Sequence, residues 1–298
     1  MTFFQIGDAR ITPVVEMVDR SFDFFRFFPK ATRTAYDENL DWMAPGHLDA
    51  QTGRLLLSMH SWLVELNGKK ILIDGCVGNG KQRDGRPDWC NLDTPFLAQL
   101  EAAGARPEDI DYVLCTHLHA DHIGWNTRKE NGRWVPTFPK AQYVFSRRER
   151  DFWESQRGAP GPHWQAYADS VLPVVAAGQA LAVDDRHLIE GRLQLEPAPG
   201  HTPGHVAIWL TLAPGDATPA GVFTGDIIHH PIQARHPGWS CMGCRDPDQA
   251  AATRQALLER CADSGALLFP GHFMAPHAAR IHRTGAAFTV ELVCAPGD

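Results

Sequence analysis

Three histidines and one aspartate stand within six residues of one another, at His117, His119, Asp121 and His122. His117 and His119 are two residues apart, so in extended backbone their side chains point to the same side of the chain. Asp121 and His122 follow where the chain can turn into a helix, and they are expected to point elsewhere. Imidazole nitrogens and carboxylate oxygens suit zinc and other first-row divalent ions. The cluster therefore predicts two adjacent metal sites and disfavours a polar turn with solvated histidines.

A strand and two helices are predicted around this motif. The apolar run 111–115 directly before it is typical of a buried strand. The helix upstream of that run is expected to begin with Thr94 as N-cap and Pro95 as its first residue. After the motif, Ser146 and Glu149 have the spacing of a capping box, which predicts the start of the next helix.

A hairpin is predicted further upstream. Strands at 55–66 and 69–74 flank Asn67-Gly68, and this dipeptide between apolar runs is a strong hairpin signal. The second strand ends at Asp74, a carboxylate that needs partners if it is buried. Asp74 is either a hydrogen-bonded turn residue or a group that orients a metal ligand, and we favour the second role.

The second half of the chain supplies three more candidate ligands at strand ends. His201 lies in a Gly/Pro-rich turn before a strand, Asp226 follows a short buried strand, and His272 follows another. Each alone is a weak signal, because a strand-end histidine is more often a satisfied surface or core residue. A long helix between the last two strands is expected to carry a capping box with Asp246 and Gln249. The candidate strands are 193–196, 205–212, 221–224 and 266–269.

Taken together and in this order, the H-x-H-x-D-H motif and the later His, Asp and His resemble the metallo-β-lactamase superfamily of binuclear hydrolases, from Leu57 to His272. The resemblance implies an α/β fold, a four-layer αββα sandwich with the metals at one edge of two sheets. It also implies one domain over residues 1–298. Two divalent ions are expected as cofactors, with zinc favoured and manganese, iron or cobalt tolerated.

The resemblance also assigns the ligands residue by residue. It implies that His117, His119 and His201 bind the first ion and that Asp121, His122 and His272 bind the second. Asp226 would bridge the two ions with its carboxylate. His205 aligns with a position that supports the ligands and does not bind metal.

Within the superfamily, the chain resembles the N-acyl-homoserine lactonases, other lactonases and methyl parathion hydrolase. Members that hydrolyse β-lactams in the best-known branch carry cysteine where this chain has Asp226. The block 225–233 resembles methyl parathion hydrolase most. The homoserine lactonases have a substrate-contacting tyrosine three residues after the bridging aspartate, and this chain has His229 there.

The expected function is hydrolysis of a lactone or a small carboxylic ester by a hydroxide held between the two ions. Asp121 would orient this nucleophile or pass its proton to the leaving group, and His229 would donate a hydrogen bond to the developing oxyanion. The alternatives are an organophosphate triesterase of the methyl parathion type and a non-catalytic metal-binding module. The partner expected in each enzymatic case is a small-molecule substrate.

Composition excludes several other classes. The 298 residues are 44% hydrophobic, as in a globular protein with a sizeable core. A net charge of -7 does not fit a basic nucleic-acid footprint. No signal peptide is expected, and no apolar run approaches the ~18 residues of a membrane span. Seven scattered cysteines favour reduced thiols and a cytoplasmic location, and Cys241 and Cys244 are interpreted as ordinary loop cysteines.

An N-terminal arm, residues 19–50, carries five phenylalanines between Phe22 and Phe28. A helical period would not place all five on one face. The arm is therefore expected to pack on the core, to cover an apolar substrate pocket, or to contact a second subunit in a homodimer.

Overall fold

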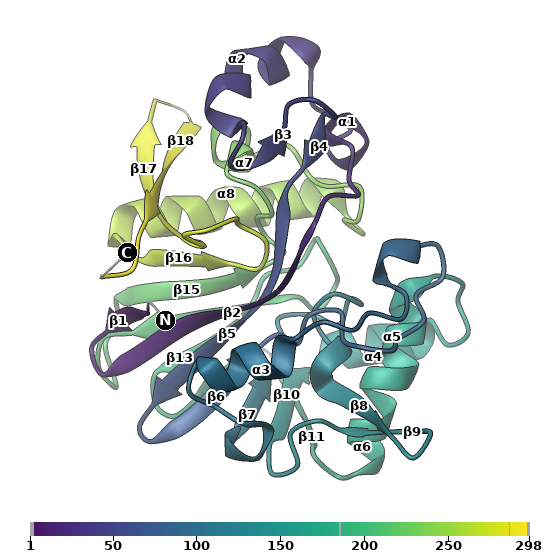
Figure 1. Cartoon of the computed structure of the whole chain (residues 1–298). Coiled ribbons are helices and arrows are strands. Elements are labelled where there is room, and N and C mark those ends of the chain that lie inside the picture. Colours follow the sequence, from purple (N-terminus) through teal and green to yellow (C-terminus); the bar gives the residue numbers. More distant parts are fainter. Residues whose placement is uncertain (1–2, 185, 286, 297–298) are drawn as a thin grey trace. The chain divides into compact units, whose positions relative to one another are not determined.

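The computed structural model describes residues 3–184, 186–285 and 287–296, and these form two compact units (Figure 1). Unit 1 contains residues 3–17 and 59–190, and unit 2 contains residues 18–58 and 191–296. Each unit therefore combines two stretches that are far apart along the chain. No helix among the described residues is long and apolar enough to cross a bilayer.

Unit 1 is built on a sheet with the strand order β1-β2-β5-β6-β7-β10-β11. The predicted hairpin is confirmed, because β5 and β6 pair antiparallel and are joined by Asn67 and Gly68 at φ 52 and 73. Positive φ at both residues is what the tight hairpin turn requires. Strands β6, β7, β10 and β11 run parallel to one another. The strand bounds are β1 Phe4–Ile6, β2 Ala9–Asp19, β5 Leu57–Leu66, β6 Lys69–Ile73, β7 Tyr112–Leu114, β10 Gln142–Ser146 and β11 Ala180–Val183.

The helices of unit 1 correct two capping predictions. Helix α3 has Pro95 as its N-cap, and the hydroxyl of Thr94 donates instead to Glu16 and Asn79, at 3.2 and 3.1 Å. Ser146 caps α4 as expected, but the carboxylate of Glu149 turns away from the cap to other partners. The bounds are α3 Phe96–Ala102, α4 Arg147–Ser155, α5 Pro162–Ser170 and α6 Leu172–Ala176, with a β8–β9 hairpin at Thr127–Glu130 and Arg133–Pro136 and the short strand β12 at His187–Ile189.

Unit 2 contains the sheet order β13-β14-β15-β16-β17-β18. Strands β15 and β16 are parallel neighbours, so their carboxyl ends lie at the same edge of the sheet. The four strands predicted in this half are confirmed, whereas β17 and β18 were not predicted. The bounds are β13 Leu193–Pro197, β14 Val206–Thr211, β15 Pro219–Gly225, β16 Leu267–Pro270, β17 Ala278–Thr284 and β18 Ala287–Val293.

Helix α8, Pro247–Ser264, lies alongside this sheet (Figure 1). Asp246 caps it by accepting from the backbone N–H of Gln249 at 2.9 Å, as predicted. The side chain of Gln249 donates to Thr253 instead of completing the capping box. Leu257, Leu258 and Cys261 of α8 join a core cluster with strands β14 to β18. This packing holds the amino end of α8 beside the loop that precedes β14.

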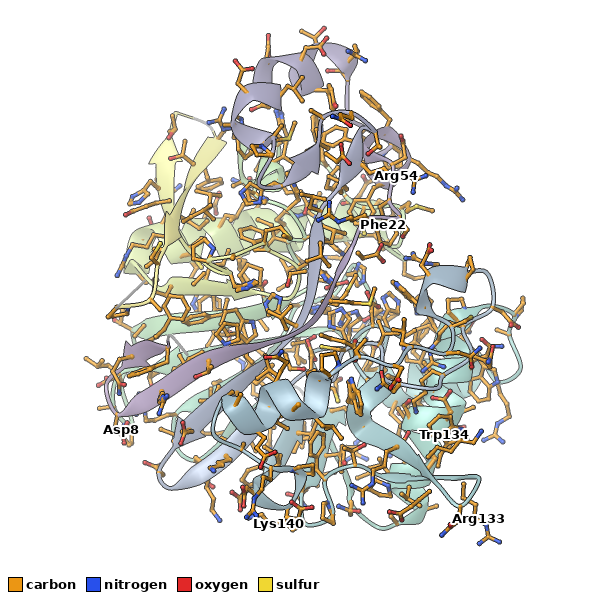
Figure 2. The ribbon with its side chains drawn as sticks, in the orientation of Figure 1. Asp8, Phe22, Arg54, Arg133, Trp134 and Lys140 are labelled. Atoms are coloured by element: carbon orange, nitrogen blue, oxygen red, sulfur yellow. The ribbon has the colours of Figure 1, made fainter. Side chains whose placement is uncertain are left out.

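The N-terminal arm packs within unit 2. Phe24 and Phe28 are fully buried, and both rings lie 6.2 Å from the ring of Trp239. Phe22 contacts Phe27, and Arg54 donates to the backbone oxygens of residues 20 and 21, which holds the start of the arm against the strand β4 that follows the arm (Figure 2). The elements here are α1 Phe24–Phe27, α2 Arg33–Met43, β3 Leu48–Asp49, β4 Arg54–Leu55 and α7 Ile232–Arg235.

Candidate functional site

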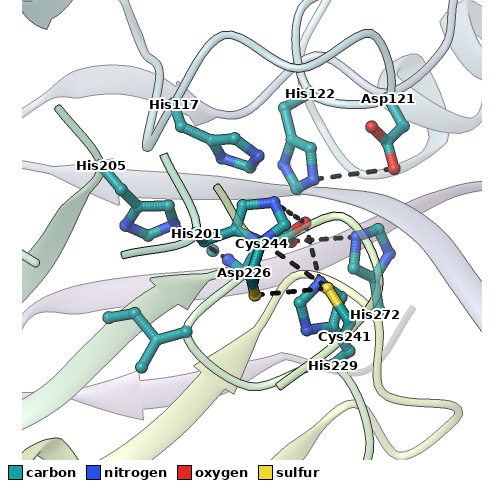
Figure 3. A network of polar contacts seen from close by, with 12 residues as sticks. His117, Asp121, His122, His201, His205, Asp226, His229, Cys241, Cys244 and His272 are labelled. Atoms are coloured by element: carbon teal, nitrogen blue, oxygen red, sulfur yellow. Dashed lines mark hydrogen bonds and ion pairs between the residues drawn. The ribbon is translucent and has the colours of Figure 1, made fainter. Parts of the chain in front are cut away.

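In unit 1, the loop after β7 gathers the three histidines of the motif. The ring of His117 lies 4.7 Å from that of His119 and 4.2 Å from that of His122. Asp121 adds a carboxylate oxygen 3.9 Å from Nε2 of His122 (Figure 3). All three histidines are buried. The loop thus presents imidazole nitrogens and one carboxylate together, which is a donor set that suits zinc.

Asp74, at the end of β6, orients one of these histidines. Its Oδ2 lies 2.9 Å from Nδ1 of His122, and its two oxygens accept from the backbone N–H and the hydroxyl of Thr116, each at 2.8 Å. A carboxylate on Nδ1 keeps the proton there and leaves Nε2 available to a metal. Asp74 has φ 61, an unusual value for a non-glycine residue that marks the turn after the strand. The contacts support the orienting role that we favoured.

Gly124 allows the motif loop to approach the loop after β6. A Cβ at Gly124 would lie 1.7 Å from the carbonyl oxygen of Val77, so only glycine fits at this position. Two backbone hydrogen bonds join the loops here, from Gly124 to Cys76 and from Trp125 to Gly75, at 2.8 and 2.7 Å. The position of the histidines relative to Asp74 therefore depends on this close contact.

Two further residues hold the motif loop, and neither was predicted. Glu149 of α4 accepts from the backbone N–H of Leu118 at 3.2 Å, and its side chain is fully buried. His163 of α5 accepts from the backbone N–H of Ala120 and stacks on the ring of His119 at 4.0 Å. The capping-box spacing of Glu149 suggested a local role, and no pattern in the sequence connects it with the motif.

In unit 2, the carboxylate of Asp226 lies at the centre of three imidazoles (Figure 3). Its oxygens are 3.1 Å from Nε2 of His201, 3.1 Å from Nε2 of His229 and 3.0 Å from Nε2 of His272. Asp226 follows β15 and His272 follows the parallel neighbour β16, which explains why these two meet. His205 does not join the ring of nitrogens but accepts from the backbone N–H of Asp226 at 3.0 Å.

The electrostatics of this cluster fit a bound cation. Burial favours the neutral form of His201, but the charge and hydrogen bond of Asp226 outweigh it and raise its pKa to about 10. Burial dominates for His229 and lowers its pKa. A carboxylate that attracts protons so strongly would also attract a divalent cation, and the same nitrogen and oxygen atoms are suitable zinc ligands.

Cys241 and Cys244, interpreted from the sequence as ordinary loop cysteines, lie against His201. Their sulfurs and Nδ1 of His201 all lie within 4.8 Å of one another. The hydrogen bond from Cys241 keeps the pKa of the Cys244 thiol below its usual range. The two other loop histidines have structural contacts, since His230 lies 3.2 Å from the carbonyl oxygen of His47 and His236 stacks on Trp239.

The fold and these clusters agree with the comparison with known families. The model of the metallo-beta-lactamase superfamily matches residues 56–272, so the chain belongs to that superfamily. Among curated proteins, it is 28% identical over 226 residues to the N-acyl homoserine lactonase AttM of Azorhizobium caulinodans, covering 67% of this chain and 76% of the relative. It is 27% identical over 178 residues to metallo-beta-lactamase domain-containing protein 1 of Xenopus laevis, covering 59% and 60% of the two chains.

Solved structures confirm the fold. The crystal structure of AbOPH, a hydrolase in the beta lactamase superfamily, superposes with a TM-score of 0.80 at 23% identity, over 98% of this chain and 97% of that chain. AidC, a dizinc quorum-quenching lactonase, superposes with a TM-score of 0.79 at 22% identity, over 98% and 96%. The predicted metallo-β-lactamase fold is therefore confirmed, and the prediction of a metal-dependent hydrolase is borne out at the level of that class.

Proposed function

We propose that this protein is a two-metal hydrolase that opens a lactone ring or cleaves a small carboxylic ester. The observation that carries the proposal is the buried carboxylate of Asp226, with three imidazole nitrogens at 3.0 to 3.1 Å. A carboxylate in that position is what a bridging ligand requires. The similarity to an N-acyl homoserine lactonase supports a lactone as the substrate class.

The proposed ligands follow the assignment made from the sequence. His117, His119 and His201 would hold one divalent ion, and Asp121, His122 and His272 would hold the other. Asp226 would bridge them, and zinc is the ion that this nitrogen and oxygen set favours. When bound, such a pair of ions lowers the pKa of a bound water to about 7 and polarises the carbonyl group of the substrate.

The side chains of the protein would supply the remaining steps. Asp121 would accept the proton of the attacking water and return it to the departing alkoxide. His229 would donate a hydrogen bond to the oxyanion, and removing one such donor typically costs ~2.7–4 kcal/mol of barrier. Its ring packs edge-to-face against Phe27 at 5.4 Å, so the arm shapes the apolar surroundings of this residue.

The first test is the Asp226→Asn variant. Removing the charge should reduce metal content and should lower kcat/KM for lactones by more than the ~10–100-fold typical of losing an outer-shell partner. Metal content is measured by elemental analysis and activity with a lactone panel. Asp248→Asn, at an exposed position of α8, is the control and should behave as wild type. A variant that retains two metals and full turnover would refute the assignment.

A phosphotriester is a second candidate substrate, because the block 225–233 resembles methyl parathion hydrolase. Lactones, aryl esters and phosphotriesters compared by kcat/KM would distinguish the two activities. A metal-loaded protein that is inert on all three classes would favour the non-catalytic metal-binding module.

A further inference from the structure

Cys241 and Cys244 form a close pair in the loop between α7 and α8 of unit 2. Their sulfurs are 3.6 Å apart (Figure 3). The backbone N–H of Cys244 donates to the carbonyl oxygen of Cys241 at 3.1 Å, and this turn brings both side chains to the same side. Cys241 is buried, whereas Cys244 is partly exposed. Cys244 is therefore the more accessible member of the pair.

The pair lies on one edge of the His201 ring. Nδ1 of His201 is 3.5 Å from Sγ of Cys244 and 3.8 Å from Sγ of Cys241. Nε2, on the opposite edge, is 3.1 Å from Asp226. Sγ of Cys244 thus occupies the position at which a metal-binding histidine normally meets the partner that orients it. Sγ of Cys241 lies next to it and is also 3.5 Å from Nε2 of His229.

Backbone contacts keep this arrangement together. Arg245 and Asp246 donate their N–H groups to the carbonyl oxygens of His201 and Gly200, each at 2.9 Å. A Cβ at Gly200 would lie 2.3 Å from the backbone nitrogen of Ala250, so the two segments approach this closely because residue 200 is glycine. The cysteine loop therefore cannot move freely relative to His201.

A sulfur atom is an unusual hydrogen-bond partner for Nδ1 of a metal-binding histidine. The second nitrogen of a metal-binding histidine usually donates to a carboxylate, a backbone carbonyl or water. Here sulfur takes that place beside Nδ1 of His201. Two adjacent thiols can be oxidised to a disulfide, which would draw the sulfurs away from this nitrogen. We propose that Cys241 and Cys244 are a reversible oxidation site, whose disulfide withdraws the sulfurs from Nδ1 of His201 and weakens metal binding.

The reaction needs a peroxide as oxidant and balances in two steps. The sulfur of Cys244 attacks one peroxide oxygen, so that an S–O bond forms, the O–O bond breaks and one water leaves. The sulfur of Cys241 then attacks Cys244, an S–S bond forms, the S–O bond breaks and a second water leaves. Two thiols lose two electrons and two protons, and hydrogen peroxide becomes two waters. The sulfurs must approach from 3.6 Å to about 2.05 Å for the bond to form.

The effect on metal binding rests on the proposed function, whereas formation of the disulfide does not. The experiment therefore measures both. Full-length, reduced, zinc-loaded protein is treated with hydrogen peroxide, and peptides are mapped by mass spectrometry after free thiols are blocked. We expect a linked Cys241–Cys244 peptide that dithiothreitol reverses. Chelator competition should show zinc binding about 10–100-fold weaker in the oxidised protein.

Two variants control the experiment. In Cys241→Ser combined with Cys244→Ser, peroxide should leave zinc affinity unchanged, because no disulfide can form. Cys90→Ser, at a partly exposed cysteine of unit 1, should retain the full response of wild type. Absence of the linked peptide, or a linked peptide with unaltered zinc affinity, would overturn the proposal. A thiolate-to-metal charge-transfer band in cobalt-loaded protein would also overturn it, because the sulfurs would then be ligands. Disulfide formation in a protein that binds no zinc would instead refute the proposed function.

Discussion

Two buried carboxylates organise the imidazoles, one in each unit. Asp74 contacts Nδ1 of His122 and accepts hydrogen bonds from the backbone N–H and the hydroxyl of Thr116. Asp226 contacts Nε2 of three histidines. The two carboxylates contact different ring nitrogens. A carboxylate at Nδ1 fixes the tautomer of the histidine, whereas a carboxylate at Nε2 lies on the side of the ring that would face a metal. Asp74 is therefore expected to orient a ligand, and Asp226 to be one.

The orienting role of Asp74 can be tested with Asp74→Asn. The amide keeps the size of the side chain but loses the charge that supports His122, so zinc affinity should fall by about 10–100-fold. Chelator competition measures the change. Asp88→Asn, at an exposed carboxylate of the same unit, should bind zinc as wild type does. Equal affinities of the Asp74 variant and wild type would contradict the orienting role.

Residues that belong to a local sequence pattern could be predicted. The histidine and aspartate cluster of the motif and the role of Asp74 at a strand end could both be predicted. Glu149 and the pair Cys241 and Cys244 could not, because their partners are set by how loops fold onto each other. The spacing of Glu149 matched a helix cap, and its burial against Leu118 is a tertiary contact that no local pattern encodes.

At the scale of elements, the ends of strands and the loops that follow them carry the chemistry. The loops after β6 and β7 are joined at Gly124, where the backbone of one loop contacts that of the other. The loop before β14 meets the first turn of α8 in the same way at Gly200, and its backbone accepts hydrogen bonds from residues 245 and 246. Both junctions depend on a glycine with no space for a side chain.

Gly124→Ala should therefore destabilise the fold. The added methyl group meets a backbone oxygen at 1.7 Å, and such overpacking typically costs about 1–3 kcal/mol or more. Urea unfolding measures the loss. Gly46→Ala, where a Cβ would meet nothing within 4 Å, is the matched control and should change stability by no more than ~0.5 kcal/mol. If both variants unfolded alike, the close junction would have no energetic role.

Elements with strong local signals were predictable, and those that depend on tertiary context were not. The Asn67-Gly68 hairpin follows from turn chemistry alone. The Thr94 cap failed because Glu16 and Asn79 offer its hydroxyl better partners than the helix end does. The β17–β18 hairpin was missed because most residues of the two strands are not buried. Its large buried side chains are those of Ile281 and Phe288.

At the scale of the whole molecule, a buried charge cluster should make stability depend on pH. Lys81 and Arg83 are fully buried and share the carboxylate of Asp169, at 3.3 and 2.7 Å. Burial lowers the pKa of Lys81 to about 7, although Asp169 opposes the shift. An unfolded lysine titrates near 10.4. Between these values the unfolded chain binds one more proton than the folded protein does.

The contribution of Lys81 to the free energy of unfolding should therefore rise with pH above about 7, by up to ~1.4 kcal/mol per pH unit. Below pH 7 this contribution should be nearly independent of pH. Lys81→Met removes the titration. The difference in unfolding free energy between wild type and this variant should grow from pH 7 to pH 9 in urea unfolding experiments. Lys140→Met, at an exposed lysine, should show no such trend. A difference that stays constant over this range would place the pKa of Lys81 near its ordinary value.

The burial of the phenylalanine arm against Trp239 also has a consequence for synthesis. Phe24 and Phe28 leave the ribosome about 200 residues before Trp239 does, which corresponds to ~10–40 s at ordinary translation rates. During that interval the aromatic rings have no native surface to cover them. Nascent chains arrested before Trp239 should therefore expose this segment to proteases and chaperones, whereas chains arrested after α8 should protect it.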